Sequence, residues 1–181
     1  GTPRQPGLNE QAISWLKIRG DLQPELALQD LDGFSHVWLI FVFHLNKTSR
    51  YHAKVHPPRL GGESKGLFST RTPHRPNNIG LSLVKLKSVE KDTLILSGAD
   101  LVHGTPILDV KPYLPNVESI PDAKVGWLEQ VLTKTIEVVW SGNSKAELKS
   151  WSEEALIRNL KQTEQDLCKL VEVTLQLDPR P

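Results

Sequence analysis

The sequence predicts a mainly β protein of the α+β class: a small β-barrel-like domain with peripheral helices. Segments typical of strands come first along the chain, and segments typical of helices follow them. No G-x-G-x-x-G segment follows a strand and opens a helix, so the pattern is not Rossmann. The length of 181 residues suits one domain with a small appendage.

The expected strands are short and are separated by segments rich in proline and glycine. They cover residues 12–18, 37–44, 67–70, 79–89, 94–97, 107–110 and 133–140, with a short helix at 24–31. The segment 37–44 is continuously apolar and aromatic, which predicts a strand buried on both faces. The segments 79–89 and 94–97 are joined by a short turn and predict a hairpin.

The character of the sequence changes near residue 142. Ser144 and Glu147 have the spacing of a capping box at a helix start, and residues 163–177 form a second amphipathic pattern. We therefore expect a β-barrel-like catalytic domain over residues 1–141 and a helical extension over 142–181.

Charge and composition narrow the class of protein. There is one cysteine, Cys168, which excludes a disulfide framework within the chain and favours a reducing, cytoplasmic compartment. No apolar run approaches the roughly 20 residues that span a membrane. Residues 44–76 hold seven lysines or arginines and one acid, Glu63, in a chain of net charge +1. Such a block attracts phosphate or carboxylate, although it is equally compatible with a solvated basic loop.

Four segments carry more polar, proline and glycine residues than ordinary turns: 2–7, 55–62, 69–80 and 100–113. In the third, Pro73 excludes a regular helix between Arg71 and Arg75, so both arginines must be displayed by a fixed loop. Arginine binds carboxylate or phosphate in a bidentate manner, and we prefer ligand binding to surface salt bridging for this pair.

The histidines give little support for a metal site. His52 and His56 have the spacing of a metal pair, but the prolines that follow argue against a helix, and no third ligand lies nearby. His44 ends a buried strand and is either a satisfied core histidine or a group that points into a pocket. His103 beside Gly104 suits a tight turn with free backbone groups.

Asp109 and Lys111 alternate along an expected strand, so they share one face. They are either a cross-strand ion pair at the surface or an acid/base group held next to a cation. Asp109, Lys111 and His44 are the candidate catalytic residues. No nucleophile-elbow sequence supports a catalytic serine, and the tryptophans are more often core than base-stacking groups.

Five ordered blocks of sequence carry a family resemblance. They are PRQPG at the start, LDGFSHVWLIFVFH, HPPRLGG, GLFSTRTPHRPNNIGLSLVKL and GADLVHGTPILDVKPYLP. With this set the chain resembles the TsaA-like proteins, also called the TrmO family, from residue 1 to about 122, and again at the DPRP of the C-terminus.

The resemblance implies a homodimeric, β-barrel S-adenosylmethionine-dependent methyltransferase. Its expected reaction is methylation of N6 of N6-threonylcarbamoyladenosine at position 37 of tRNA. The motif match places cofactor binding on Pro3, Arg4, Gln5, Phe43, His44, Arg71, Leu81, Asp100, Leu101, Val102, His103, Gly104 and Thr105. The cations expected to bind RNA or the modified base are Lys54, Arg59, Arg75 and Lys111, and no metal or membrane is expected.

Two departures from the family pattern accompany the match. Family members usually have a further strand before PRQPG and a small domain after DPRP, and both are missing here. The sequence also contains no methionine, so the chain is expected to be a fragment. A non-catalytic tRNA-binding or S-adenosylmethionine-binding module would use the same pocket residues, and the sequence leaves this alternative open.

Overall fold

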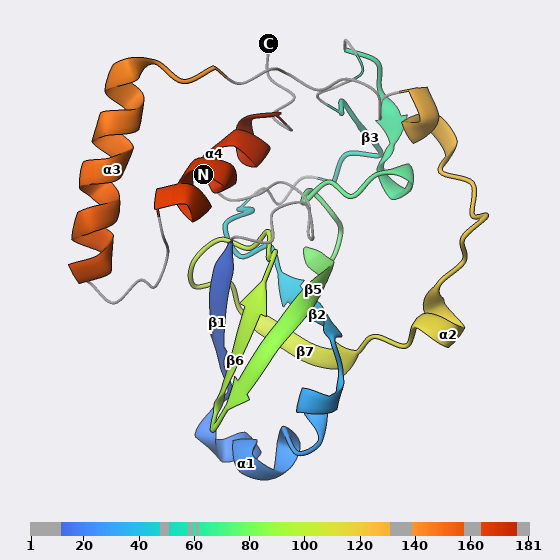
Figure 1. Ribbon diagram of the computed structural model, residues 1–181. Coiled ribbons are helices and arrows are strands. Elements are labelled where there is room, and N and C mark those ends of the chain that lie inside the picture. Colours follow the sequence, from blue (N-terminus) through green and yellow to red (C-terminus); the bar gives the residue numbers. More distant parts are fainter. Residues whose placement is uncertain are drawn as a thin grey trace.

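A computed structural model describes residues 12–47, 51–57, 60, 62–130, 139–157 and 164–176. Its centre is a five-stranded antiparallel sheet of order β1-β6-β5-β2-β7 (Figure 1). The strands are β1 (Ile13–Lys17), β2 (His36–Val42), β5 (Ile79–Glu90), β6 (Thr93–Ser97) and β7 (Ile107–Pro112). The predicted mainly β architecture and the β5–β6 hairpin are confirmed.

The prediction that residues 37–44 are buried on both faces was wrong. Buried and half-buried residues alternate along β2, with Val37, Leu39 and Phe41 on the buried face. One face of the sheet carries the core, to which β5 and β6 add four buried residues: Val84, Leu86, Leu94 and Leu96. The opposite face is only partly covered by described residues, so the apolar run belongs to a strand with one fully buried side.

Strand β5 shows why an alternating pattern does not identify the core face. Gly80, Ser82 and Val84 are buried, whereas Ile79 and Leu81 are 46% and 52% exposed. The larger apolar side chains at the start of the strand therefore lie on the open face. Gly80 is required here because a β-carbon would come within 2.3 Å of the Phe41 ring.

Short elements surround the sheet. They include the α-helices α1 (Pro24–Ala27) and α2 (Pro115–Glu118), the strand pair β3 (Lys54–Val55) and β4 (Lys65–Gly66), and the 3-10 helices η1 (Gly20–Leu22), η2 (Leu31–Gly33), η3 (Leu67–Ser69) and η4 (Gly126–Gln130). The predicted strand at 67–70 was wrong, because this segment is η3. Leu67 is buried as an anchor, while Ser69 and Thr70 bond back to the preceding turn instead of to a neighbouring strand.

Two longer helices complete the described chain, α3 (Gly142–Ile157) and α4 (Glu164–Gln176). They lie beyond the end of the sheet at which β6 finishes (Figure 1). The residue that caps α3 is Ser141, whose hydroxyl accepts the Ser144 N–H at 3.2 Å, so the predicted cap was three residues too late. The Trp140 indole donates to Glu172 at 2.6 Å and links the start of α3 to α4.

The sheet is open within the described residues. Strands β1 and β7 form its two edges and are not paired with each other. The predicted strand at 133–140 falls mostly outside the described residues, and Val139 and Trp140 are not in a strand. None of the described helices is long and apolar enough to cross a membrane.

Candidate functional site

Two of the four polar segments, 69–80 and 100–113, meet at the end of β2. The Val42 N–H donates to the Pro106 carbonyl at 3.0 Å, and the Phe43 N–H donates to the Asn78 carbonyl at 2.8 Å. The strand thus joins the 100–106 segment on one side and the 71–78 segment on the other. Half-buried His44 follows directly, with its N–H bonded to the Val42 carbonyl.

Asn46 and Asn78 fix the 71–78 segment. The Asn46 side-chain amide donates to the Pro73 carbonyl and to Asn78 Oδ1, each at 3.0 Å. Asn78 has a positive φ of 49°, which asparagine tolerates better than most residues. These two bonds tie Pro73 and Asn78 of the loop to the residue that follows the strand end, so the loop has a defined shape without regular secondary structure.

The 100–105 segment contains the turn that the sequence predicted. Gly104 has a φ of 77°, and the Thr105 N–H donates to the Val102 carbonyl at 3.1 Å. The Thr105 hydroxyl donates to the same carbonyl at 2.6 Å, while His103 is exposed. Half-buried Leu101 packs against the core and anchors the turn to the sheet.

Asp100 joins this turn to the buried face of β5. The Ser82 hydroxyl donates to Asp100 Oδ1 at 2.7 Å. Burial raises the pKa of the Asp100 carboxyl above its usual value, an effect partly opposed by the Ser82 hydrogen bond and by the positive charge of Arg71. Arg71 and Asp100 are 29 positions apart in sequence, and the charge of Arg71 acts weakly on the Asp100 carboxyl. The hydrogen bonds of the β2 end to Pro106 and Asn78 place the third and fourth polar segments next to each other.

Asp109 and Lys111 form an ion pair at the surface of β7. Lys111 Nζ lies 2.8 Å from Asp109 Oδ2, and their side chains are 60% and 45% exposed, respectively. The hydrogen bond from Lys111 lowers the pKa of Asp109, so this carboxylate is a weaker base than a free aspartate. The sequence left two interpretations open, and the structure shows the surface ion pair. It forms within β7 and not across two strands.

Leu81 and Asp109 belong to the other face of the sheet. Both lie directly opposite Ile40 of β2, one from β5 and one from β7, and opposing residues share a face. A register shift between Ile40 and Phe41 leaves Leu108 unpaired as a bulge beside this row. The candidate site therefore extends across the end of the sheet, with Asp100 on the core side and Leu81 on the open side.

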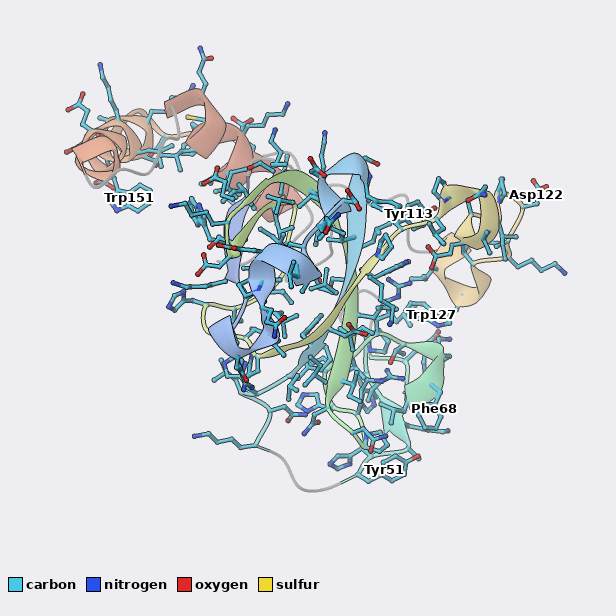
Figure 2. The ribbon with its side chains drawn as sticks, turned by 90° about the horizontal axis from the view of Figure 1, so that it is seen from below. Tyr51, Phe68, Tyr113, Asp122, Trp127 and Trp151 are labelled. Atoms are coloured by element: carbon cyan, nitrogen blue, oxygen red, sulfur yellow. The ribbon has the colours of Figure 1, made fainter. Side chains whose placement is uncertain are left out.

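Arg75 is held beside an exposed aromatic ring. Its guanidinium donates to the Thr70 carbonyl at 2.9 Å and lies 5.7 Å from the centroid of the Phe68 ring. The Trp127 indole donates to the Ser69 carbonyl at 2.9 Å, which brings η4 against η3. Figure 2 labels Phe68 and Trp127 on the same side of the molecule.

The structure thus brings together most of the predicted pocket: Phe43, His44, Arg71, Asp100, Leu101, Val102, His103, Gly104 and Thr105. Leu81 lies on the neighbouring strand, and Lys54 is exposed on β3. Pro3, Arg4, Gln5 and Arg59 lie outside the described residues. Sequence reasoning missed Asn46, Asn78 and Ser82, for which the Asn-Asn-Ile-Gly turn and a serine inside an apolar strand were the available signals.

No group of three or more metal-binding side chains occurs in the part of the chain that the structure describes. The polar groups of the site are instead arginines, histidines, an aspartate and backbone amides. This set suits an organic ligand with a carboxylate and hydrogen-bonding edges better than a bare metal ion.

Comparison with known proteins identifies the family. Residues 1–119 match the model of the tRNA-methyltransferase O N-terminal domain. The chain belongs to the TrmO family. It is 38% identical to an Escherichia coli tRNA (adenine(37)-N6)-methyltransferase over 184 aligned positions, which cover 99% of this chain and 74% of that protein.

Two further relatives define the extent of the match. A Rattus norvegicus tRNA (adenine(37)-N6)-methyltransferase is 54% identical over 121 residues, which are 66% of this chain but only 28% of the rat protein. The crystal structure of TrmO from Pseudomonas aeruginosa superposes with a TM-score of 0.71 at 36% identity, covering 98% of this chain and 73% of that one. The predicted family is confirmed, and the TrmO fold extends through the described helices.

Proposed function

We propose that this TrmO-family chain transfers a methyl group from S-adenosylmethionine to N6 of N6-threonylcarbamoyladenosine at position 37 of tRNA. The observation that carries the proposal is the junction of the β2 end, the Arg71 loop and the Val102–Thr105 turn. It lies within the region matched by the TrmO N-terminal domain, in a chain whose relatives are named tRNA (adenine(37)-N6)-methyltransferases.

The residues of this junction fit S-adenosylmethionine. Arg71 provides a cation for the amino-acid carboxylate, and the Val102–Thr105 turn offers backbone groups to an adenine edge. Gly104 leaves open space beside the turn, since a β-carbon there would meet nothing within 4 Å. Once bound, the cofactor supplies an electrophilic methyl group, and the chain needs no metal for that role.

The main contribution of the protein to catalysis is to orient the cofactor and the acceptor base. Methyl transfer is an in-line displacement, and correct placement of the reactants contributes up to roughly 7–11 kcal/mol to catalysis. Loop 71–78 and turn 102–105 are both hydrogen-bonded to the β2 end, directly or through Pro106 and Asn78. This arrangement holds the two binding elements at a fixed separation.

The acceptor nitrogen must lose a proton, and His44 is the preferred base. Asp109 is already hydrogen-bonded to Lys111, which lowers the pKa of its carboxyl and weakens it as a base. His44 is half-buried at the junction, and its side chain forms no hydrogen bond or ion pair with a described residue. We therefore assign proton removal to His44. Asp109 and Lys111 would instead line the open face of the sheet beside the site.

The threonyl carboxylate of the modified base needs a cation of its own. Arg75 is the best-supported candidate because its guanidinium donates to the Thr70 carbonyl, which fixes the side chain within the 71–78 loop. Lys54 is exposed on β3, and Lys111 is partly neutralised by Asp109, while Arg59 lies outside the described residues. The basic block of residues 44–76 would bind the RNA backbone.

We also propose a homodimer in which the open face of the sheet is covered. Ile79 and Leu81 expose 46% and 52% of their surfaces at the start of β5, and half-buried Trp38, Ile40 and Val42 line the same face. Closing this face by a barrel-like arrangement, by the partner, or by both would remove apolar surface from water.

The proposed catalytic domain runs over residues 1–141 and is followed by the helical extension 142–181. We place the protein in the cytoplasm, which fits a tRNA-modifying enzyme with a single cysteine.

The deciding experiment compares two tRNAs with labelled S-adenosylmethionine in excess chelator. We expect methylation of tRNA that carries threonylcarbamoyladenosine and almost none of unmodified tRNA. Acylation makes the N6 proton more acidic, and a site built for the threonyl carboxylate is left with an unpaired cation when it is absent. Comparable methylation rates on the two tRNAs would refute the proposed substrate. Loss of S-adenosylmethionine binding on chelation would refute the metal-free site. Binding of S-adenosylmethionine and tRNA without methyl transfer would indicate a non-catalytic module.

A further inference from the structure

The Phe68 side chain is exposed on the surface, although hydrogen bonds of the neighbouring residues hold its backbone in place. Its side chain is 73% exposed, next to Leu67, which is 1% exposed. The Leu67 N–H donates to the Ala53 carbonyl at 2.9 Å, and the Ser69 and Thr70 hydroxyls each donate to carbonyls of the same turn at 2.8 Å. A single exposed apolar residue is ordinary, but this one sits on a rigid 3-10 turn.

A cation lies beside the ring, and a second aromatic residue is hydrogen-bonded to the next residue of the turn. The Arg75 guanidinium lies 5.7 Å from the ring centroid, and with 73% of the residue exposed it does not cover both faces of the ring. The Trp127 indole is fixed to the Ser69 carbonyl at 2.9 Å. Tyr51, 55% exposed, lies along the same side of the molecule as Phe68 and Trp127 (Figure 2).

The surroundings of the ring favour a polyanion. Phe68 lies inside the block of residues 44–76, which holds seven lysines or arginines and one acid. An exposed aromatic ring beside an arginine within a basic segment is the combination that binds single-stranded nucleic acid, where bases stack and cations follow the phosphates. Phe68 lies in η3, directly before the 71–78 loop that carries Arg71 and Arg75 to the candidate cofactor site.

We propose that Phe68 is a stacking platform for an unpaired base of the tRNA anticodon loop, next to the acceptor nucleotide. Arg75 contributes cation–π attraction to the ring, and the Trp127 indole supports the turn through its hydrogen bond to the Ser69 carbonyl. This inference rests on the proposed tRNA substrate, because it assigns one contact of that substrate. Phe68 has no part in binding S-adenosylmethionine or in proton transfer.

The test uses a fluorescent anticodon stem-loop that carries threonylcarbamoyladenosine, titrated with the full chain and with Phe68 variants. A stacked base contributes roughly 1–3 kcal/mol, so we expect Phe68→Ala to weaken binding about 5- to 150-fold. Phe68→Leu keeps apolar volume but has no ring and should lose nearly as much, whereas Phe68→Trp should bind like the wild type. The dependence of affinity on salt should be unchanged in Phe68→Ala because no phosphate contact is lost.

Trp151→Ala is the matched control, since Trp151 is a 54% exposed aromatic residue on α3, away from this surface (Figure 2). It should bind the stem-loop normally, and all variants should bind S-adenosylmethionine like the wild type, which also verifies folding. Wild-type affinity in Phe68→Ala or Phe68→Leu overturns the stacking role. Failure of the wild-type chain to methylate the modified tRNA would instead reject the proposed function, so the two failures are distinguishable.

Discussion

The buried face of the sheet and the loops at the end of β2 are held together in different ways. The face is built from apolar side chains such as Leu39 and Leu94, which are almost fully buried. The loops depend on a few polar groups, chiefly Asn46, Asn78 and Asp100. Substitutions should therefore affect stability and ligand binding separately, because the buried face carries most of the apolar burial and the loops carry most of the proposed binding groups.

The largest effect on stability is expected in the core. Leu39 is 1% exposed, so Leu39→Ala should lower the free energy of unfolding by about 2–5 kcal/mol through lost burial and a residual cavity. Leu26, 67% exposed on α1, is the control, and Leu26→Ala should change it by no more than about 0.5 kcal/mol. Denaturant unfolding measures both, and equal values would mean that the two sites are not buried as described.

The next effect should fall on binding with little change in stability. In the proposed site, Arg71→Ala removes a charge-assisted hydrogen bond of about 1.5–3 kcal/mol to the cofactor carboxylate, so affinity should fall roughly 10- to 150-fold. Lys47→Ala removes an exposed lysine just after the β2 end and should bind normally. Calorimetry with S-adenosylmethionine gives both values, and two equally small losses would exclude the 71–78 loop from the cofactor site.

Asn78 tests whether the loop depends on one residue for its shape. Asn78→Ala loses the hydrogen bond from Asn46 and places an alanine at a φ of 49°, which costs roughly 1–2 kcal/mol. Asn78→Gly relieves the backbone strain but not the lost bond, and it should recover part of the stability measured by thermal unfolding. If alanine and glycine behave alike, backbone conformation does not limit the loop.

The smallest effect should be a pH dependence from Asp100, whose carboxyl is only partly buried. Its pKa is raised in the folded state, so the folded protein holds this proton at pH values where the unfolded chain has released it. The contribution of Asp100 to stability therefore falls as pH rises from the usual aspartate range through the raised pKa. Asp100→Asn cannot ionise, and its stability relative to the wild type should increase from acidic to neutral pH. A difference that shrinks over this range would contradict the burial of Asp100.

The sheet could be predicted from sequence where the pattern is local. The β5–β6 hairpin and the position of β7 follow from alternation and turn residues. The core face of β5 could not, because apolar residues occupy both faces, and the fold places Gly80 and Ser82 inward. Residues 67–70 favour a strand by composition, yet hydroxyl bonds to the preceding turn stabilise η3 instead.

The site could be predicted residue by residue but not in its contacts. Family motifs indicate Arg71 and Asp100 separately, whereas their interaction depends on strands that bring distant loops together. The pairing of Asp109 with Lys111 was one of two open readings, and only side-chain geometry distinguishes them. Phe68 carried no sequence signal, because exposure cannot be inferred for an aromatic residue within an expected strand.

The close approach of Gly80 to Phe41 has a consequence for how this fold can vary. Any side chain at position 80 would overlap the ring, since even a β-carbon would lie 2.3 Å from it. The Phe41 ring also packs edge-on against the ring of Phe43, the residue before His44, with 5.1 Å between the ring centroids. Positions 41 and 80 should therefore covary among relatives, with a side chain at 80 accompanied by a smaller residue at 41, and sequences that change only one of them should be rare.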